Sequence, residues 1–85
     1  MFTVYIIQNE QRKSYTGYTV DINKRLLRHN GELTSKNTSY TKRIGGYWRV
    51  IYREDYNTRK EALLRERFLK SGKGREWLKI NIEGR

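Results

Sequence analysis

The chain contains five residues whose types and spacing could support hydrolysis of a phosphodiester bond. Tyr5 and Tyr15 lie ten residues apart, and Arg25 follows after a further ten. His29 comes four residues after Arg25, which places the two on one face if this segment is helical. Glu66 lies farther along the chain, with Ala62 and Leu63 at the preceding turn if this segment is helical.

These residue types match the charges of the reaction. A scissile phosphate is an anion whose charge moves onto the leaving oxygen, so a metal ion and a guanidinium are natural stabilisers. Glu66 would hold Mg²⁺ together with waters and phosphate oxygens, and Arg25 would clamp the phosphate. The base that activates water is either His29, with an ordinary pKa near 6.5, or a tyrosine whose pKa of about 10 is lowered by the metal or by Arg25.

Each residue also has a structural alternative. The two tyrosines could be core residues with hydrogen-bonded hydroxyls, and the histidine could be a cation at a helix C-terminus. Arg25 could pair with Asp21, and Glu66 with Lys70, each across one helical turn. The choice between these alternatives depends on the joint pattern and not on any one residue.

Composition and charge narrow the function classes. The 85 residues correspond to one domain, residues 1–85. A formal net charge of +10 indicates a polyanionic partner, with nucleic acid favoured over an acidic membrane or protein. The absence of cysteine and the single histidine exclude disulfide scaffolds and ordinary zinc sites, and suit a cytoplasmic protein. The sequence lacks an apolar run of membrane-spanning length and a basic flank of the signal-peptide kind at its start.

Hydrophobic patterning and capping signals predict a mixed fold in the order β-β-α-(loop)-β-α-α, with a three-stranded sheet covered by helices. The predicted strands and helices are Phe2–Gln8, Ser14–Val20, Ile22–Asn30, Tyr47–Tyr56, Thr58–Ser71 and Arg75–Lys79, with a polar loop over Glu32–Gly46.

Several local signals set these boundaries. Asp21 is a good N-cap, and Ile22, Leu26 and Leu27 are predicted to form the buried stripe of the first helix. Thr58 and Glu61 have the spacing of a capping box. In the third strand, Trp48, Val50 and Tyr52 are predicted to share one face. The segment Ser71-Gly72-Lys73-Gly74 is predicted to break the chain between the last two helices.

Three segments resemble the GIY-YIG nuclease family, including the catalytic domains of an excision-repair nuclease subunit and of intron homing endonucleases. Thr3-Val4-Tyr5 stands where the family has Gly-Ile-Tyr, and Tyr15-Thr16-Gly17 stands for Tyr-Ile-Gly. The segment Lys60–Lys70 resembles the metal-binding helix of the family. Tyr40-Thr41-Lys42 is similar to a segment of the small single-domain bacterial members, and Asn81 falls at a supporting asparagine.

The resemblance implies an α/β (α+β) domain with a three-stranded antiparallel sheet and Mg²⁺-dependent cleavage of DNA, with Mn²⁺ as an alternative. The tyrosines and Arg25 would surround the phosphate and the attacking water, and either a tyrosine or the histidine would be the base. The metal ligand would be Glu66 and not Glu61, and Gly17 would support the site.

Two positions depart from the family pattern. Thr3 replaces the first glycine, which is expected to affect backbone packing more than chemistry. Tyr18 stands where some catalytic relatives have lysine, so a lysine role at that position is absent.

Three functions follow as hypotheses: a metal-dependent DNA endonuclease of repair or recombination, a non-catalytic nucleic-acid-binding module, and a protein-interaction domain that uses the strand Tyr47–Tyr56. RNA is an alternative nucleic acid, and a partner protein or a homodimer could supply specificity. The candidate phosphate-binding residues are basic positions in the polar loop and after the second helix, namely Lys36, Lys42, Arg43, Lys70, Lys73 and Arg75.

Overall fold

The computed structural model describes residues 1–30 and 46–83. Its elements are β1 (Phe2–Gln8), β2 (Ser14–Thr19), α1 (Ile22–His29), β3 (Arg49–Tyr56), α3 (Arg59–Lys70), α4 (Gly72–Leu78) and a π-helical turn, η1 (Lys79–Glu83). The three strands form one antiparallel sheet in the order β2-β1-β3. The predicted fold class and element order are therefore confirmed. None of the helices in the described ranges combines the length and apolarity needed to cross a membrane.

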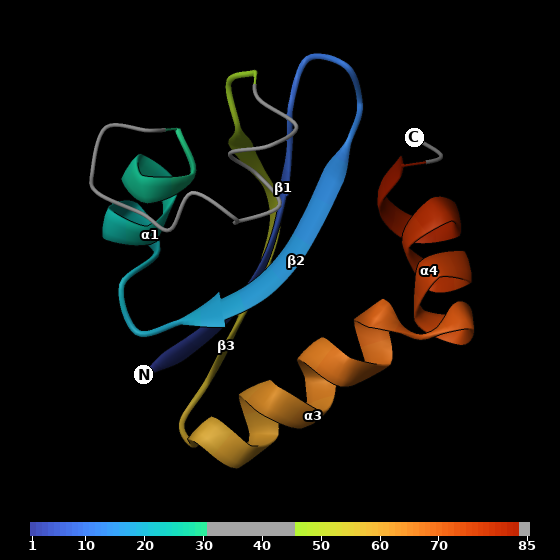
Figure 1. Cartoon of the computed structure of the whole chain (residues 1–85). Helices are drawn as coiled ribbons and strands as arrows, with labels where there is room; N and C mark the ends of the chain where they lie inside the picture. The colour runs from blue at the N-terminus through green and yellow to red at the C-terminus, as the bar shows by residue number, and fades with distance from the viewer. Residues whose placement is uncertain (31–45, 84–85) are drawn as a thin grey trace.

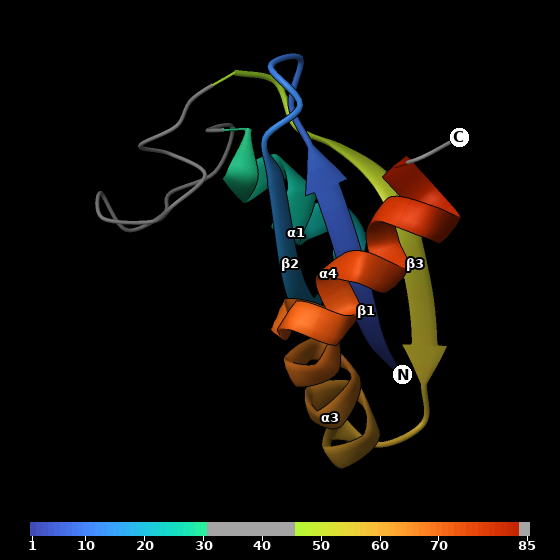
Figure 2. The ribbon, with the colours of Figure 1, turned by 90° about the vertical axis from the view of Figure 1, so that its right-hand side faces the viewer.

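The sheet lies between two helical layers, with α1 on one face and α3 with α4 on the other (Figures 1 and 2). Because side chains alternate along a strand, the central strand β1 supplies both cores. Val4 and Ile6 pack with residues of α3 and α4, whereas Tyr5 and Ile7 pack with Trp48 on the α1 face. All four β1 side chains are at most 1% exposed, so β1 is the rigid support of both layers.

The end of α1 is tied to the sheet by Asn30. Its side-chain amide donates to the Trp48 carbonyl at 2.9 Å and accepts from the Trp48 N–H at 2.5 Å. Asp21 caps the other end, where its Oδ1 accepts from the Lys24 N–H at 3.0 Å. These contacts hold α1 against the face that carries Tyr5. The predicted burial of Leu27 is wrong, because its side chain is 41% exposed.

A bulge in β3 overturns the predicted alternation of that strand. Ile6 pairs with Tyr52 while Ile7 pairs with Val50, so Ile51 is an extra residue. Val50 therefore packs on the α1 face with Trp48. Tyr52 packs against the core under α3 and α4, and the prediction that it shares the face of Trp48 is wrong.

The capping prediction for α3 is confirmed, and so is the break at Ser71, but the predicted extension of that break to Gly74 is wrong. Thr58 accepts from the Glu61 N–H at 3.2 Å. Ser71 then serves as the N-cap of α4, accepting from the Gly74 N–H at 3.2 Å, so α4 begins at Gly72 and not at Arg75. A Cβ atom at Gly74 would lie 1.9 Å from the Phe68 carbonyl oxygen. The glycine is there because the two helices approach closely, not because the helix stops.

Candidate active site

Tyr5 and His29 meet on the α1 face of the sheet. Tyr5 projects from the middle of β1, and His29 is the last residue of α1. The Tyr5 hydroxyl and His29 Nε2 are 2.8 Å apart. Tyr5 is only 1% exposed, so the core-tyrosine alternative is right about its burial, yet its hydroxyl is bonded to a titratable partner.

Burial sets the protonation of this pair. Burial, followed by the positive charge of Arg25, lowers the pKa of His29 to about 4. Burial also raises the pKa of the Tyr5 hydroxyl, with Tyr15 and Glu66 adding to the rise and Arg25 opposing it. At neutral pH the histidine is therefore uncharged, and in its Nδ1–H tautomer the Nε2 atom accepts a hydrogen bond from the Tyr5 hydroxyl. The lowered pKa argues against the alternative in which His29 is a cation that complements the helix dipole.

Tyr15 and Gly17 bring β2 against the same pair. The Tyr15 ring centroid lies 6.4 Å from that of Tyr5 and 5.0 Å from that of His29. Gly17 lies opposite Tyr5 in the register of the two strands. A Cβ atom at Gly17 would be 2.7 Å from the Tyr5 hydroxyl oxygen and 3.0 Å from Cε2 of Tyr15. Glycine is thus required here to make room for the two tyrosines.

A cavity of about 500 Å³ opens beside these rings, and we refer to it as the tyrosine cavity. Arg25 enters it from α1 and Glu66 from α3, although the two lie 41 residues apart in the sequence. The residues that line the tyrosine cavity are Phe2, Tyr5, Tyr15, Gly17, Tyr18, Thr19, Val20, Arg25, Arg59 and Glu66.

Glu66 forms the ion pair with Lys70 that the structural alternative predicted, and it also lines the tyrosine cavity. Its carboxylate lies 3.6 Å from Lys70 Nζ, as the pairing alternative requires, and its side chain is only 15% exposed. The lysine side chain is 50% exposed, and ion pairs with such exposed partners contribute little. The carboxylate therefore faces the tyrosine cavity with a weakly held partner.

The donors in the tyrosine cavity fit a hard divalent cation better than zinc. Across residues 1–30 and 46–83, no three histidine, cysteine, aspartate or glutamate side chains gather into a metal cage. The cavity offers the single carboxylate of Glu66. Mg²⁺ is commonly held by one or two carboxylates with water and phosphate oxygens completing its shell, whereas zinc sites take three or four protein ligands.

Comparison with known proteins shows the family of the chain. Residues 1–81 match the family described as the GIY-YIG catalytic domain. The chain belongs to the GIY-YIG family. It is 38% identical to a UPF0213 protein of Staphylococcus epidermidis over 81 residues, covering 95% of this chain and 94% of that protein. A UPF0213 protein of Staphylococcus saprophyticus is 33% identical over the same shares of the two chains.

A solved structure is similar over the same region. The solution NMR structure of a UPF0213 protein from Bacillus halodurans matches with a TM-score of 0.52 and 28% identity, covering 92% of this chain and 82% of that one. The family resemblance inferred from the sequence is therefore confirmed, and the chain belongs to a family of nucleases.

The two departures from the GIY-YIG pattern have structural explanations. Thr3 is 5% exposed, and its hydroxyl donates to Asp55 Oδ1 at 2.7 Å across the sheet. Tyr18, which stands where some relatives have lysine, accepts a hydrogen bond from Arg59 Nε at 3.2 Å. A cation therefore lies beside Tyr18 even though no lysine does.

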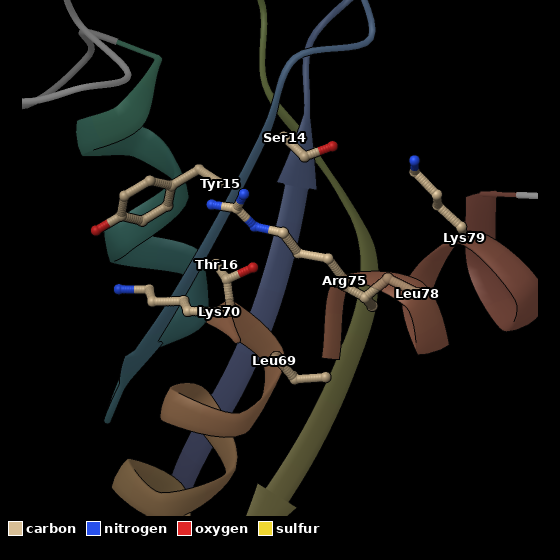
Figure 3. Close-up of a pocket in the computed structure, with 8 residues that line it drawn as sticks. All are labelled: Ser14, Tyr15, Thr16, Leu69, Lys70, Arg75, Leu78 and Lys79. Atoms are coloured by element: carbon tan, nitrogen blue, oxygen red, sulfur yellow. The ribbon is translucent and has the colours of Figure 1, made fainter. Parts of the chain in front are cut away.

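A second cavity of about 500 Å³ lies on the α4 side of β2, and we refer to it as the basic cavity (Figure 3). Two of the predicted phosphate-binding residues, Lys70 and Arg75, line it, and Tyr15 lines both cavities. The residues that line the basic cavity are Ser14, Tyr15, Thr16, Leu69, Lys70, Arg75, Leu78 and Lys79.

Other predicted residues lie elsewhere. Asn81 lines neither cavity, and its Nδ2 donates to the Trp77 carbonyl at 2.9 Å within the C-terminal helical segment. Lys73 is exposed on α4 and also lines neither cavity. Three basic predictions, Lys36, Lys42 and Arg43, together with the Tyr40-Thr41-Lys42 segment, lie outside the described residues.

The structure adds two cations that sequence reasoning missed. Arg59 lines the tyrosine cavity. It precedes Glu66 by seven residues, which is two helical turns and hence the same face of α3. Lys79 lines the basic cavity and follows Arg75 by four residues. Helical spacing from a residue already selected could have identified both.

Proposed function

We propose that this chain is a divalent-metal-dependent endonuclease that hydrolyses phosphodiester bonds in DNA, with residues 1–85 acting as one domain. The observation that carries the proposal is the convergence of Tyr5, Tyr15, Arg25 and Glu66 on the tyrosine cavity from four separate elements. These groups are a guanidinium, a carboxylate and two hydroxyls, which are the donors and acceptors that phosphate hydrolysis uses.

Arg25 and Glu66 have complementary tasks at the phosphate. Arg25 binds and orients the scissile phosphate through its guanidinium, and its charge offsets the charge that develops on the phosphate oxygens. Glu66 would hold Mg²⁺, with Mn²⁺ as an alternative, and the bound ion would supply Lewis-acid stabilisation of that charge. Tyr15 positions the phosphate from the β2 side.

Tyr5 and His29 form a proton path for the attacking water. In the Nδ1–H tautomer of His29, the Tyr5 hydroxyl donates its proton across the 2.8 Å contact to Nε2, so a lone pair of the Tyr5 oxygen can accept a proton from water. As the water oxygen bonds to phosphorus, Tyr5 takes the water proton and passes its own to Nε2, while the bond from phosphorus to the leaving strand oxygen breaks and that oxygen takes a proton from solvent. Burial is the larger cause of the lowered pKa of His29, and the charge of Arg25 is the second. A phosphate beside Arg25 offsets this second cause, so substrate binding makes the histidine a better proton acceptor.

The charge of the chain indicates how DNA would be held. A net charge of +10 on 85 residues supports binding through phosphates, which positions a duplex without reading its sequence. We therefore propose recognition of DNA structure, as in repair or recombination in the cytoplasm, with a partner protein or second copy as a source of further specificity.

The proposal is tested by Glu66→Ala with Glu61→Ala as its matched control. Both glutamates are on α3, but Glu61 belongs to the Thr58 cap. With plasmid, single-stranded and branched DNA and Mg²⁺ or Mn²⁺, Glu66→Ala should lower the cleavage rate by about 100-fold or more, and EDTA should abolish cleavage. Glu61→Ala should cleave normally once its folding is verified.

Equal cleavage by wild type and Glu66→Ala would show a contaminating nuclease and remove the proposal. Salt-sensitive DNA binding without metal-dependent cleavage on any substrate would instead support a non-catalytic nucleic-acid-binding module.

A further inference from the structure

The basic cavity adjoins the tyrosine cavity, and the function proposed above does not use it. We infer that the basic cavity is a subsite for one unstacked nucleotide of the substrate strand, next to the scissile phosphate. This inference rests on the proposed nuclease function, and it adds a substrate class: DNA with an unpaired nucleotide beside the cut.

The rim of the basic cavity is cationic. Lys70, Arg75 and Lys79 come from the end of α3, from α4 and from η1, and the other five lining residues include no acid. All three cations are exposed, and Figure 3 shows Arg75 reaching across the cavity toward β2. The lining itself holds no carboxylate, and Lys70 pairs with Glu66 of the tyrosine cavity at 3.6 Å. The net positive charge of the rim suits a phosphate of the strand backbone.

The floor of the basic cavity is apolar. Leu69 and Leu78 are 1% and 7% exposed and form its base. The half-buried Tyr15 forms one wall, and Ser14 and Thr16 add hydroxyls from β2. A volume of about 500 Å³ is within the range of small-ligand sites. An apolar floor under a cationic rim matches a nucleotide, because its base has a flat apolar face and its phosphate is an anion.

Tyr15 connects the two cavities. It lines both, and its ring centroid is 5.8 Å from Lys70 Nζ, while the same ammonium is 3.6 Å from the Glu66 carboxylate. A strand with one phosphate at Arg25 therefore brings its neighbouring nucleotide to the basic cavity. A base that enters a concave site cannot remain stacked in a duplex, so single strands, flaps and mismatches should be preferred to uninterrupted duplex.

The test compares Arg75→Ala with Arg67→Ala. Both variants remove one exposed arginine, but only Arg75 lines the basic cavity. The substrates are a fully paired duplex, the same duplex with an unpaired nucleotide beside the cut, and that substrate with the unpaired base removed to leave an abasic site. Wild type and Arg67→Ala should cleave the unpaired substrate about tenfold faster than the other two. Arg75→Ala should cleave all three at similar rates.

A second variant tests the subsite without a change of charge, and a binding measurement tests it without cleavage. Ser14→Trp fills the basic cavity without changing charge and should also remove the preference for the unpaired base. An oligonucleotide with 2-aminopurine at successive positions should change fluorescence at one position on binding to wild type or Arg67→Ala, and not on binding to Ser14→Trp. This signal does not require cleavage.

The possible failures are distinguishable. Glu66-dependent cleavage that ignores the unpaired base, or equal losses in Arg75→Ala and Arg67→Ala, would overturn the subsite and leave the nuclease proposal standing. Absence of cleavage with a position-specific 2-aminopurine signal lost in Ser14→Trp would support nucleotide binding and overturn the nuclease. Absence of both would overturn both.

Discussion

Two regions of this molecule contain the same residue types but differ in the partners of their carboxylates. The tyrosine cavity has two tyrosines, an arginine and Glu66, and the Glu54 cluster has Tyr52, Tyr56, Arg65 and Glu54. The two carboxylates are almost equally buried, since their side chains are 17% exposed at Glu54 and 15% exposed at Glu66. Burial therefore does not distinguish a structural carboxylate from a functional one.

The difference lies in what satisfies each carboxylate. Glu54 accepts from the Tyr52 hydroxyl, from the Tyr56 hydroxyl at 2.6 Å, and from Arg65 Nε and Nη2 at 2.9 and 3.1 Å. Burial opposes its ionisation, but the hydrogen bonds from Arg65 and the two tyrosines outweigh burial and lower its pKa. The donors around Glu54 already occupy it, whereas Glu66 faces a cavity with an exposed lysine as its ion-pair partner.

Arg65 makes further contacts within the Glu54 cluster. Its guanidinium carbon lies 5.0 Å from the ring centroid of Phe68 and 5.0 Å from that of Trp77, a cation–π arrangement that adds to the ion pair. The cluster thereby ties β3 to α3 and α4. The polar groups of the cluster bond to one another, whereas the Glu66 carboxylate lines a cavity that a substrate can fill.

The contrast between the Glu54 cluster and the tyrosine cavity predicts that removal of the Glu54 carboxylate destabilises the protein. Glu54→Ala leaves Arg65 and two tyrosine hydroxyls without their shared acceptor, and should lower the free energy of unfolding by about 2–3 kcal/mol. Glu66→Ala should change it by less than about 0.5 kcal/mol, because it removes only an ion pair to an exposed lysine. Urea titrations of both variants measure the difference. Similar losses in the two variants would contradict the distinction drawn here.

Gly17 and Gly72 differ in the space available for a side chain, so their alanine variants test how closely the tyrosine cavity is packed. Gly17→Ala forces a methyl group to within 2.7 Å of the Tyr5 hydroxyl oxygen, and should cost about 1–2 kcal/mol of stability through overpacking while displacing Tyr5 from His29. Gly72→Ala is the control, since nothing lies within 4 Å of a Cβ atom there and alanine is the better helix former. The midpoint of urea unfolding should fall for the first variant and not for the second. An unchanged midpoint for Gly17→Ala would mean that the tyrosines are not closely packed.

These positions also show what the sequence could predict about the fold. Local signals with a direct physical cause, such as the Thr58 cap and the β1 run, gave correct elements. Gly74 was misjudged because the sequence records a glycine but not its reason, which is the approach of α4 to the Phe68 backbone. The prediction of the sheet face on which Tyr52 lies was wrong, because an alternating sequence pattern does not reveal a one-residue bulge.

The sequence allowed the residues of the candidate site to be selected, but it did not predict how they are arranged in space. Helical spacing placed Arg25 and His29 on one face of a helix, and the family resemblance selected Glu66. The Tyr5–His29 hydrogen bond depends on where Asn30 anchors the end of α1, a contact between segments 18 residues apart. Local patterns carry no information about such a contact, and for the same reason the basic cavity, which is built from β2, α3, α4 and η1, could not be foreseen.

The smallest predicted effect is a difference between His29 and Glu54 in the pH range over which each contributes to stability. His29 has a folded-state pKa of about 4, below the ordinary 6.5. The unfolded chain therefore binds the proton first on acidification, so the contribution of His29 is complete above pH 6.5 and is lost as the pH falls toward 4. The pKa of Glu54 is lowered from 4.5, so its contribution is lost only below that pH.

Between pH 7 and pH 5 the histidine should therefore dominate the difference. Wild type should lose stability on the order of 1 kcal/mol over this interval from His29, after allowance for solvent screening. His29→Gln should lose correspondingly less, because glutamine does not titrate, while Glu54→Gln should follow the wild-type slope. Urea unfolding at the two pH values gives the three slopes. A wild-type slope retained in His29→Gln would mean that the proton acceptor beside Tyr5 is not the group that senses this interval, and the proton path proposed for the tyrosine cavity would lose its support.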